Sequence, residues 1–222
     1  MAGALALAPC VALGAAVLLG GFAVRLAGVY LAMLTLAFAQ IVWSIVYQWD
    51  AVTGGSNGIV GVWPASWLEG DNYYYFTLAI VTLAIIVVRR MAFSPFGYAL
   101  RALRDSPLRA DALGINVKAV QWTAFVVAGT LAGLAGALYV FSKGSTSPEV
   151  ITVGKSVDGL VMVLLGGIQT LFGPVVGAFV IIAMQSYLAE LGSWVTIVQG
   201  IIFVVCVLAF RRGIIGELEH FL

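Results

Sequence analysis

Most of the side chains that could do chemistry stand in one stretch of this chain, residues 93–117. The stretch reads FSPFGYALRALRDSPLRADALGINV and is the only long charged run in a sequence that is 62% hydrophobic and 9% charged. Ser-Pro pairs at 94–95 and 106–107 each place a hydroxyl N-cap before a proline at the first helical position. Gly114 suits the left-handed residue that ends many helices. We therefore predict two short helices outside the membrane, Pro95–Arg104 and Pro107–Leu113.

An amphipathic element of this kind can bind either a lipid surface or a groove on a protein. Arginines alone would favour anionic lipid. Here Asp105 and Asp111 interrupt the basic run, and leucines stand beside the arginines, which suits a protein groove better. We expect residues 93–117 to be a segment that receives force from a partner protein. The residues expected to carry this contact are Arg101, Arg104, Asp105, Leu108, Arg109, Leu113 and Gly114.

Residue types needed for catalysis are scarce and scattered. The single histidine, His220, lies in the tail, and Cys10 and Cys206 both lie inside apolar runs, where cysteine behaves as a small apolar residue. The glycine-rich turn TGGSNG at 53–58 lacks the Lys-Ser/Thr and the strand-to-helix context of a phosphate loop. We expect no catalysis, no cofactor and no metal site. A net charge of +1 gives no reason to expect a nucleic-acid partner.

Polar residues inside the apolar runs are few, and none of them is ionisable. Proton- or ion-coupled pumps need Asp, Glu or His within the bilayer, so this pattern favours a permease that leaves the energy supply to another chain. The expected polar points along a pathway are Thr35, Gln40, Gln169 and Thr170. The alternative for each is a hydrogen bond between helices.

The charged segment and the polar residues are held in place by long charge-free runs of the chain, which we expect to be membrane-spanning helices. Charged side chains are missing from 2–24, 26–49, 72–88, 119–142, 159–189 and 191–210, and a membrane span needs about 20 apolar residues. We expect an all-α polytopic transmembrane helical bundle of six or seven membrane segments, with residues 1–222 forming one permease domain. Single spans are expected at Ala2–Val24, Gly28–Gln48, Tyr73–Val88, Lys118–Phe141 and Trp194–Phe210, and a broken or hairpin-like helical pair at Asp158–Ala189. A loop at Trp49–Asn72 and a polar connection at Ser142–Val157 separate them.

Small residues recur in the fourth expected span, in the pattern Gly129-x-x-x-Gly133. Such spacing lets helix backbones approach closely in lipid. We expect packing within the bundle or a dimer contact, with the lining of a pathway as the alternative.

Orientation follows from the basic residues in short loops, which favour the cytoplasmic side. If the spans alternate, one side collects Arg25, Arg89, Arg90, Arg101, Arg104, Arg109, Lys118, Arg211 and Arg212. The other side holds only Lys143 and Lys155. The segment at 93–117 and the C-terminus are therefore expected in the cytoplasm, and Met1 outside.

Seven stretches of the chain form a specific set, namely GVYLAMLTLAF at 28–38, TGGSNG at 53–58, GYALRALR at 97–104, ALGIN at 112–116, TAF at 123–125, SPE at 147–149 and LGGIQT at 165–170. In these stretches, from about Arg25 to Arg212, the chain resembles the LivM-type permease of branched-chain amino acid ABC importers. The resemblance implies a multi-pass protein of a bacterial or archaeal plasma (inner) membrane. The resemblance implies ABC ATPase subunits, a LivH-like second permease subunit and a periplasmic or extracellular substrate-binding protein as partners, besides membrane lipid. It also implies that residues 93–117 contain the coupling helix that docks on the ATPase.

Several features depart from that family. Its members usually begin with further spans, and Gln40 and Trp43 stand where an acidic and a basic residue are common. Because relatives also move urea or short amides, the same machinery with that cargo is one alternative. The others are a channel or facilitator without an ATPase, and a scaffold that transports nothing.

Overall fold

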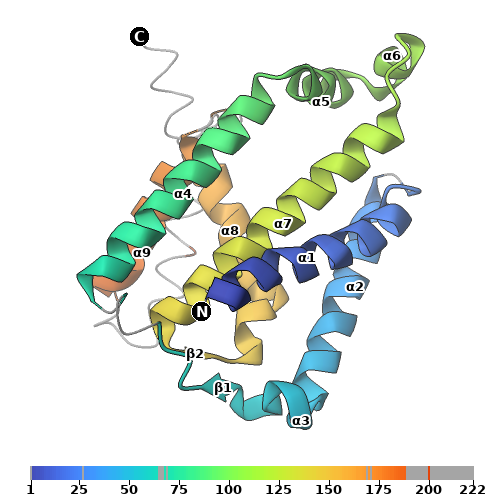
Figure 1. Cartoon of the computed structure of the whole chain (residues 1–222). Helices are drawn as coiled ribbons and strands as arrows, with labels where there is room; N and C mark the ends of the chain where they lie inside the picture. Colours follow the sequence, from blue (N-terminus) through green and yellow to red (C-terminus); the bar gives the residue numbers. More distant parts are fainter. Residues whose placement is uncertain are drawn as a thin grey trace. The chain divides into compact units, whose positions relative to one another are not determined.

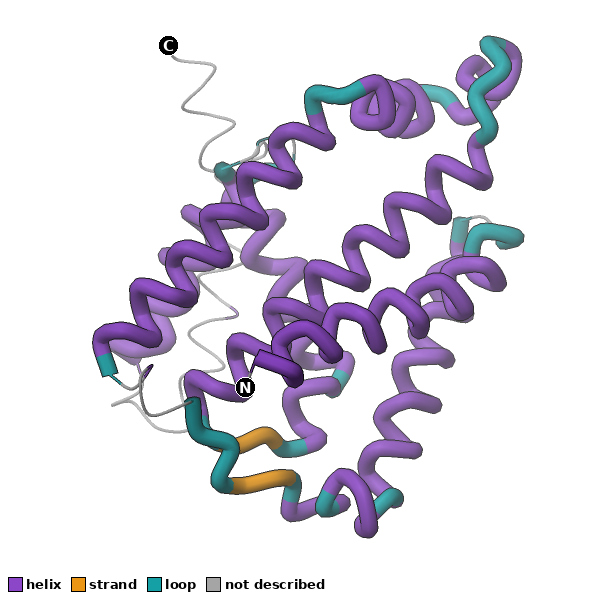
Figure 2. Tube along the Cα trace, viewed as in Figure 1, coloured by secondary structure: helices purple, strands orange, loops and turns teal. Residues whose placement is uncertain are grey.

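The computed structural model describes residues 2–26, 28–64, 68, 70–168, 170, 172–188 and 200. Helices dominate this part of the chain, and the only sheet in it is a ribbon of two short strands (Figures 1 and 2). The chain divides into two compact units, Met1–Val150 and Ile151–Leu222. The all-α membrane class expected from the sequence is confirmed, whereas a single domain over 1–222 stays a prediction.

Four helices of the first unit are long and apolar enough to cross a membrane. They are α1 (Ala2–Ala23), α2 (Val29–Gln48), α4 (Asp71–Ala92) and α7 (Val117–Lys143). Three of them lie within a few residues of the expected spans. The third is longer than expected at both ends because Asp71 and Asn72 begin the helix and the Arg89-Arg90 pair continues it instead of closing it.

The closest helix pair in the first unit is α1 with α7, which run antiparallel. Small residues recur at every fourth position of α1, at 8, 12, 16 and 20, and they face the glycines of α7. A Cβ atom on Gly129 would stand 2.6 Å from the Cβ of Ala16, and one on Gly133 would stand 3.2 Å from the carbonyl oxygen of Ala8. The expected packing within the bundle is thus confirmed, because only glycine leaves room for this approach.

One end of the first unit gathers the irregular backbone. It holds α3 (Asp50–Thr53), the 3-10 helices η1 (Gly55–Asn57) and η3 (Pro148–Ile151), and the ribbon of β1 (Ile59–Val60) and β2 (Ser145–Thr146). The two strands pair antiparallel, Ile59 opposite Thr146, so the loop after α2 and the loop after α7 lie on the same side. The expected loop at Trp49–Asn72 therefore contains ordered turns. We call this the ribbon end (Figure 1).

The opposite end carries α5 (Pro95–Asp105) and α6 (Pro107–Ala112), which connect the end of α4 to the start of α7 at the top of Figure 1. Both short helices match the predicted ranges to within one residue. We call residues 93–117 the α5–α6 segment.

The second unit contains the helices α8 (Val153–Gly166) and α9 (Gly173–Leu188), packed against each other. Glycines allow this contact: a Cβ on Gly166 would collide with the backbone of Gly173, and one on Gly177 with the carbonyl of Met162. The contacts pair residue 166 with 173 and residue 162 with 177. As one position moves back along the chain its partner moves forward, so the two helices form an antiparallel hairpin.

The hairpin arrangement expected for Asp158–Ala189 is therefore found, but its first helix starts earlier. Residues 153–157 were expected in a polar connection and instead form the first turn of α8, where the Lys155 ammonium lies 3.5 Å from the Asp158 carboxylate. The last expected span, Trp194–Phe210, lies outside the described residues apart from residue 200.

We predict that Gly129→Leu destabilises the first unit, whereas Gly136→Leu does not. The first substitution pushes a side chain into α1, and overpacking of this kind costs about 1–3 kcal/mol. Gly136 sits on the same helix with no atom within 4 Å of an added Cβ. Thermal unfolding in detergent would test this, and equal melting temperatures for the two variants would contradict the packing.

Candidate functional site

The α5–α6 segment has well-formed helix ends. Ser106 ends α5 and caps α6, because its hydroxyl accepts a hydrogen bond from the backbone N–H of Arg109 at 3.4 Å. After α6, Gly114 has a φ of 80°. The Gly114 N–H donates to the Asp111 carbonyl at 2.9 Å and the Ile115 N–H to the Ala110 carbonyl at 3.1 Å, which is the Schellman arrangement. The predicted glycine stop is confirmed.

Ser94 stands at the N-cap position of α5, as predicted, but its side chain makes no cap hydrogen bond. Its hydroxyl donates to the Met91 carbonyl at 2.6 Å and so serves the end of α4 instead of the start of α5. The reason is local: α4 runs to Ala92, which leaves its last carbonyls within reach of the next hydroxyl.

Arg101 points back to α4. One of its Nη atoms donates to the Ala92 carbonyl at 2.9 Å. The guanidinium also lies 5.4 Å from the ring centre of Phe93 and 5.2 Å from that of Tyr98. Cation–π contacts at exposed positions contribute about 0.5–1 kcal/mol. Among the expected contact residues, Arg101 is therefore engaged within the chain.

The remaining expected residues lie on the surface of the segment. Leu108 is 86% exposed and Leu113 is 78% exposed, while Arg109 and Gly114 are also exposed. Arg104 and Asp105 form an exposed pair at 3.3 Å, which adds little to stability. Leu103 and Ala110 face inward and hold the two helices in place. The surface so formed combines large apolar side chains with charges of both signs, as a protein-docking surface does.

The expected pathway residues are placed as follows. Thr35 and Gln40 lie on α2, where the Thr35 hydroxyl donates to the Ala32 carbonyl of its own helix at 2.9 Å and Gln40 is exposed. Thr170 lies in the turn of the α8–α9 hairpin, with its hydroxyl donating to the Gly167 carbonyl at 3.1 Å. Gln169 lies outside the described residues. The hydrogen bonds of Thr35 and Thr170 stay within one helix or turn and do not test a role in transport. The pathway role of all four residues therefore stays a prediction.

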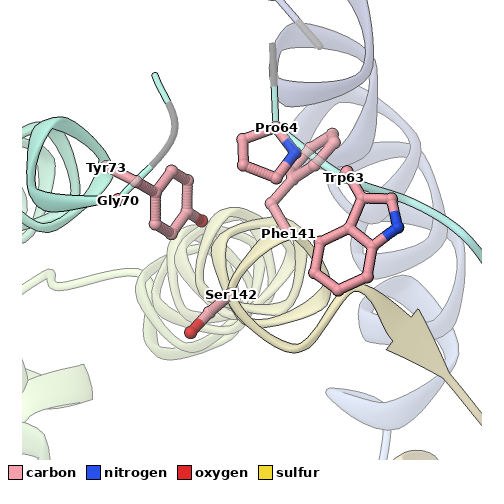
Figure 3. Close-up of a pocket in the computed structure, with 6 residues that line it drawn as sticks. All are labelled: Trp63, Pro64, Gly70, Tyr73, Phe141 and Ser142. Carbon is pink, nitrogen blue, oxygen red and sulfur yellow. The ribbon is translucent and has the colours of Figure 1, made fainter. Parts of the chain in front are cut away.

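A hollow of about 390 Å³ opens at the ribbon end between the start of α4 and the end of α7 (Figure 3). It is lined by Trp63, Pro64, Gly70, Tyr73, Phe141 and Ser142. The Tyr73 hydroxyl donates to the Leu138 carbonyl of α7 at 2.6 Å. Trp63 packs over Gly144, where a Cβ would stand 2.8 Å from the indole ring. Sequence reasoning missed this site because its members come from three separate segments.

The glycine-rich turn at 53–58 shapes a second hollow, of about 410 Å³, beside the ribbon. The Thr53 hydroxyl donates toward the carbonyls of Val46 and Trp49, at 2.6 and 2.8 Å, and closes the end of α2. Gly54, Gly55 and Gly58 have positive φ, and a side chain on Gly58 would collide with the backbone of Thr146 and Ser147. The motif therefore fixes the ribbon against α2 and carries no phosphate-loop geometry.

Comparison with known proteins gives a consistent result. The family model described as the permease component of the branched-chain amino acid transport system matches residues 1–208. The high-affinity branched-chain amino acid transport system permease protein LivM of Escherichia coli (strain K12) is 27% identical over 95% of this chain and 56% of its own length. LivM of Salmonella typhimurium is 28% identical over the same shares.

The fructose import permease protein FruG of Bifidobacterium longum is 29% identical over 64% of this chain and 45% of its own length. The chain thus spans about half the length of these curated relatives. No solved structure matches it significantly.

We predict that Ser106→Ala loosens α6 while Ser106→Asp preserves it. Alanine removes the cap acceptor, which typically costs about 1 kcal/mol, whereas aspartate can replace it. Hydrogen exchange of the amides in 107–113 should then be about fivefold faster in the alanine variant only. Unchanged exchange in Ser106→Ala would contradict the cap.

Proposed function

Because this chain belongs to the family of permease components of branched-chain amino acid transport systems, and is of the LivM type, we propose that it is a membrane subunit of an ATP-driven amino-acid importer. Its cargo would be branched-chain or other small amino acids. Two kinds of support exist: the match of the family over residues 1–208, and four described helices suited to crossing a membrane. As a permease subunit it is not itself the enzyme that hydrolyses ATP.

The energy source would be a separate ABC ATPase. The apolar runs of the chain contain no Asp, Glu or His to couple transport to an ion gradient. The chain also has no loop of the phosphate-binding type, since the glycine-rich turn at 53–58 is engaged in fixing the ribbon. The further proposed partners are a LivH-like permease subunit, a substrate-binding protein at the ribbon end and membrane lipid.

The contact with the ATPase would be the α5–α6 segment, and the exposure of Leu108 and Leu113 carries this proposal. A leucine that is 86% exposed on a capped, folded helix costs free energy in water, and a partner groove removes that cost. The arginines and aspartates around it would set the orientation of docking.

The distribution of charge supports a cytoplasmic location for this segment. Basic residues of the first unit gather at the α5–α6 end, namely Arg25, Arg89, Arg90, Arg101, Arg104, Arg109 and Lys118, while Lys143 stands alone at the ribbon end. Short loops rich in Lys and Arg stay on the cytoplasmic side. ATP is available there, so the segment and its proposed partner share a compartment.

Transport would then proceed by alternating access. Closure of the ATPase subunits around ATP would pull on the α5–α6 segment, and the helices attached to it would change the exposure of the pathway from one side to the other. The polar residues Thr35, Gln40, Gln169 and Thr170 are the proposed points along this route.

Uptake by cells tests the function directly. Deleting the gene should abolish ATP-dependent uptake of labelled leucine, and restoring it should recover uptake. Labelled urea in parallel distinguishes an amide carrier. Normal leucine uptake in the deletion strain would contradict an amino-acid importer.

We predict that Leu108→Glu weakens association with the ATPase, since a charge replaces the apolar side chain at the centre of the docking surface. Loss of a hot-spot residue near the centre of an interface costs about 2 kcal/mol or more, which is roughly 30-fold in affinity. Val60→Glu is the matched control, because Val60 is 78% exposed at the ribbon end. Co-purification of the ATPase with each variant measures the effect. Equal recovery with both variants would argue against docking at α6.

We predict that Gly114→Pro uncouples ATP hydrolysis from uptake while membrane insertion stays intact. Proline cannot adopt the φ of 80° found there, and it lacks the N–H that bonds Asp111. Gly28→Pro is the control at the same end, because Gly28 also has a positive φ and free space around it. Leucine uptake per ATP hydrolysed is the quantity to measure, and a normal ratio in Gly114→Pro would exclude a coupling role for this turn.

A further inference from the structure

The joint between α4 and α5 is closed by hydrogen bonds. A helix leaves its last four carbonyls without partners inside the helix. At the end of α4, the Arg89 carbonyl accepts from the Phe93 N–H at 3.2 Å and the Met91 carbonyl from the Ser94 N–H at 3.1 Å. The Ala92 carbonyl accepts from Arg101 at 2.9 Å. Because Arg101 belongs to the second turn of α5, this last bond fixes the direction of α5 as well as its start.

Steric contact restricts the same joint. Gly97 of α5 is buried, and an added Cβ would stand 2.7 Å from the Met91 carbonyl oxygen and collide with the backbone of Ala92. The rings of Phe93 and Tyr98 lie within 5.4 and 5.2 Å of the Arg101 guanidinium. The end of α4, the turn and α5 therefore form one stiff piece.

The other end of the segment is attached differently. The hydrogen bonds around Gly114 return to α6, and the Asn116 side chain caps α7 by accepting from the Ala119 N–H at 3.1 Å. Within the described residues, no hydrogen bond joins α6 to α7, and the two helices meet by packing. Apolar packing is non-directional, and Gly114 has open space around it. Hydrogen bonds and packing thus hold the segment to α4, whereas packing alone joins α5 and α6 to α7.

At its far end, α4 meets the hollow of Figure 3. Tyr73, which lines this hollow from the first turn of α4, donates its hydroxyl to the Leu138 carbonyl of α7. A tilt of α4 driven from the α5 joint would shift Tyr73 relative to α7. Such a tilt changes the width of the hollow and strains or breaks that hydrogen bond.

We propose that Arg101 is a positioning residue that makes α4 the lever of the transporter, carrying motion of the α5–α6 segment to the Tyr73–Leu138 contact at the ribbon end. This inference rests on the proposed function of the segment as an ATPase contact. It assigns to Arg101 a role inside the chain instead of a contact with the partner.

The test uses the complete complex with its ATPase, reconstituted in liposomes, and compares Arg101→Gln with Arg90→Gln. Both substitutions remove one positive charge near the end of α4, but Arg90 makes none of the joint contacts given above. We expect Arg101→Gln to retain the ATPase and to hydrolyse ATP, with uptake per ATP reduced by about 2- to 30-fold, the range of mutations along a coupling path. Arg90→Gln should keep the wild-type ratio.

Spin labels report the lever itself. With Cys10 and Cys206 replaced by serine, labels at Tyr74→Cys and Ser142→Cys should change their separation when ATP binds, in the wild type and in Arg90→Gln but not in Arg101→Gln. A wild-type ratio in Arg101→Gln, or an unchanged label separation in the wild type, overturns the proposal.

Two further outcomes are also decisive. If Arg101→Gln does not accumulate in the membrane, Arg101→Lys decides, since lysine keeps the charge but cannot reproduce the planar stacking and forked hydrogen bonding: reduced coupling supports the lever and normal coupling overturns it. If the wild-type chain binds no ATPase, the proposed function fails and the lever with it. If the ATPase binds and Arg101→Gln couples normally, the lever proposal fails while the proposed function stands.

Discussion

The hydrocarbon core of a membrane imposes the constraint on which the rest of this structure depends. Each backbone N–H and C=O left unpaired there costs several kcal/mol, so the chain crosses as helices. In the described part of the first unit, the turns, the strands and the charged residues are thereby confined to the two ends. Any force from outside the membrane must enter at one of these ends, and the α5–α6 segment is the folded element at the basic one.

Within lipid there is no hydrophobic driving force between helices, because the lipid tails are as apolar as the side chains. Helices therefore associate through close packing. The two tight contacts of the described residues follow this rule: α1 meets α7 through Ala16 and Gly129, and α8 meets α9 through Gly166 and Gly173. By contrast, among the described residues, α2 and α4 have none that is buried. Their surfaces suit lipid or a second permease subunit.

Much of this architecture follows from the sequence. Charge-free runs located the four described spans, the serine at 106 and the glycine at 114 predicted α6 to within one residue, and Gly129-x-x-x-Gly133 indicated close packing. Local sequence signals failed where the outcome depends on which groups of neighbouring elements lie close enough to interact. Ser94 looks like a cap, but α4 extends far enough for Met91 to take its hydroxyl. Likewise the regular spacing of small residues in α1 identifies the partner of α7 only once the two helices are seen together. The hollow at Tyr73 depends on three distant segments, which no short motif could reveal.

Photo-crosslinking in intact cells tests the central claim most directly. A photoreactive amino acid at position 108, on α6, should crosslink to an ATP-hydrolysing protein in the cytoplasm, while the same amino acid at position 60, in the ribbon, should not. Crosslinking of position 108 only to lipid or to a protein outside the cell, or capture of the ATPase from position 60, would contradict a permease driven through its α5–α6 segment.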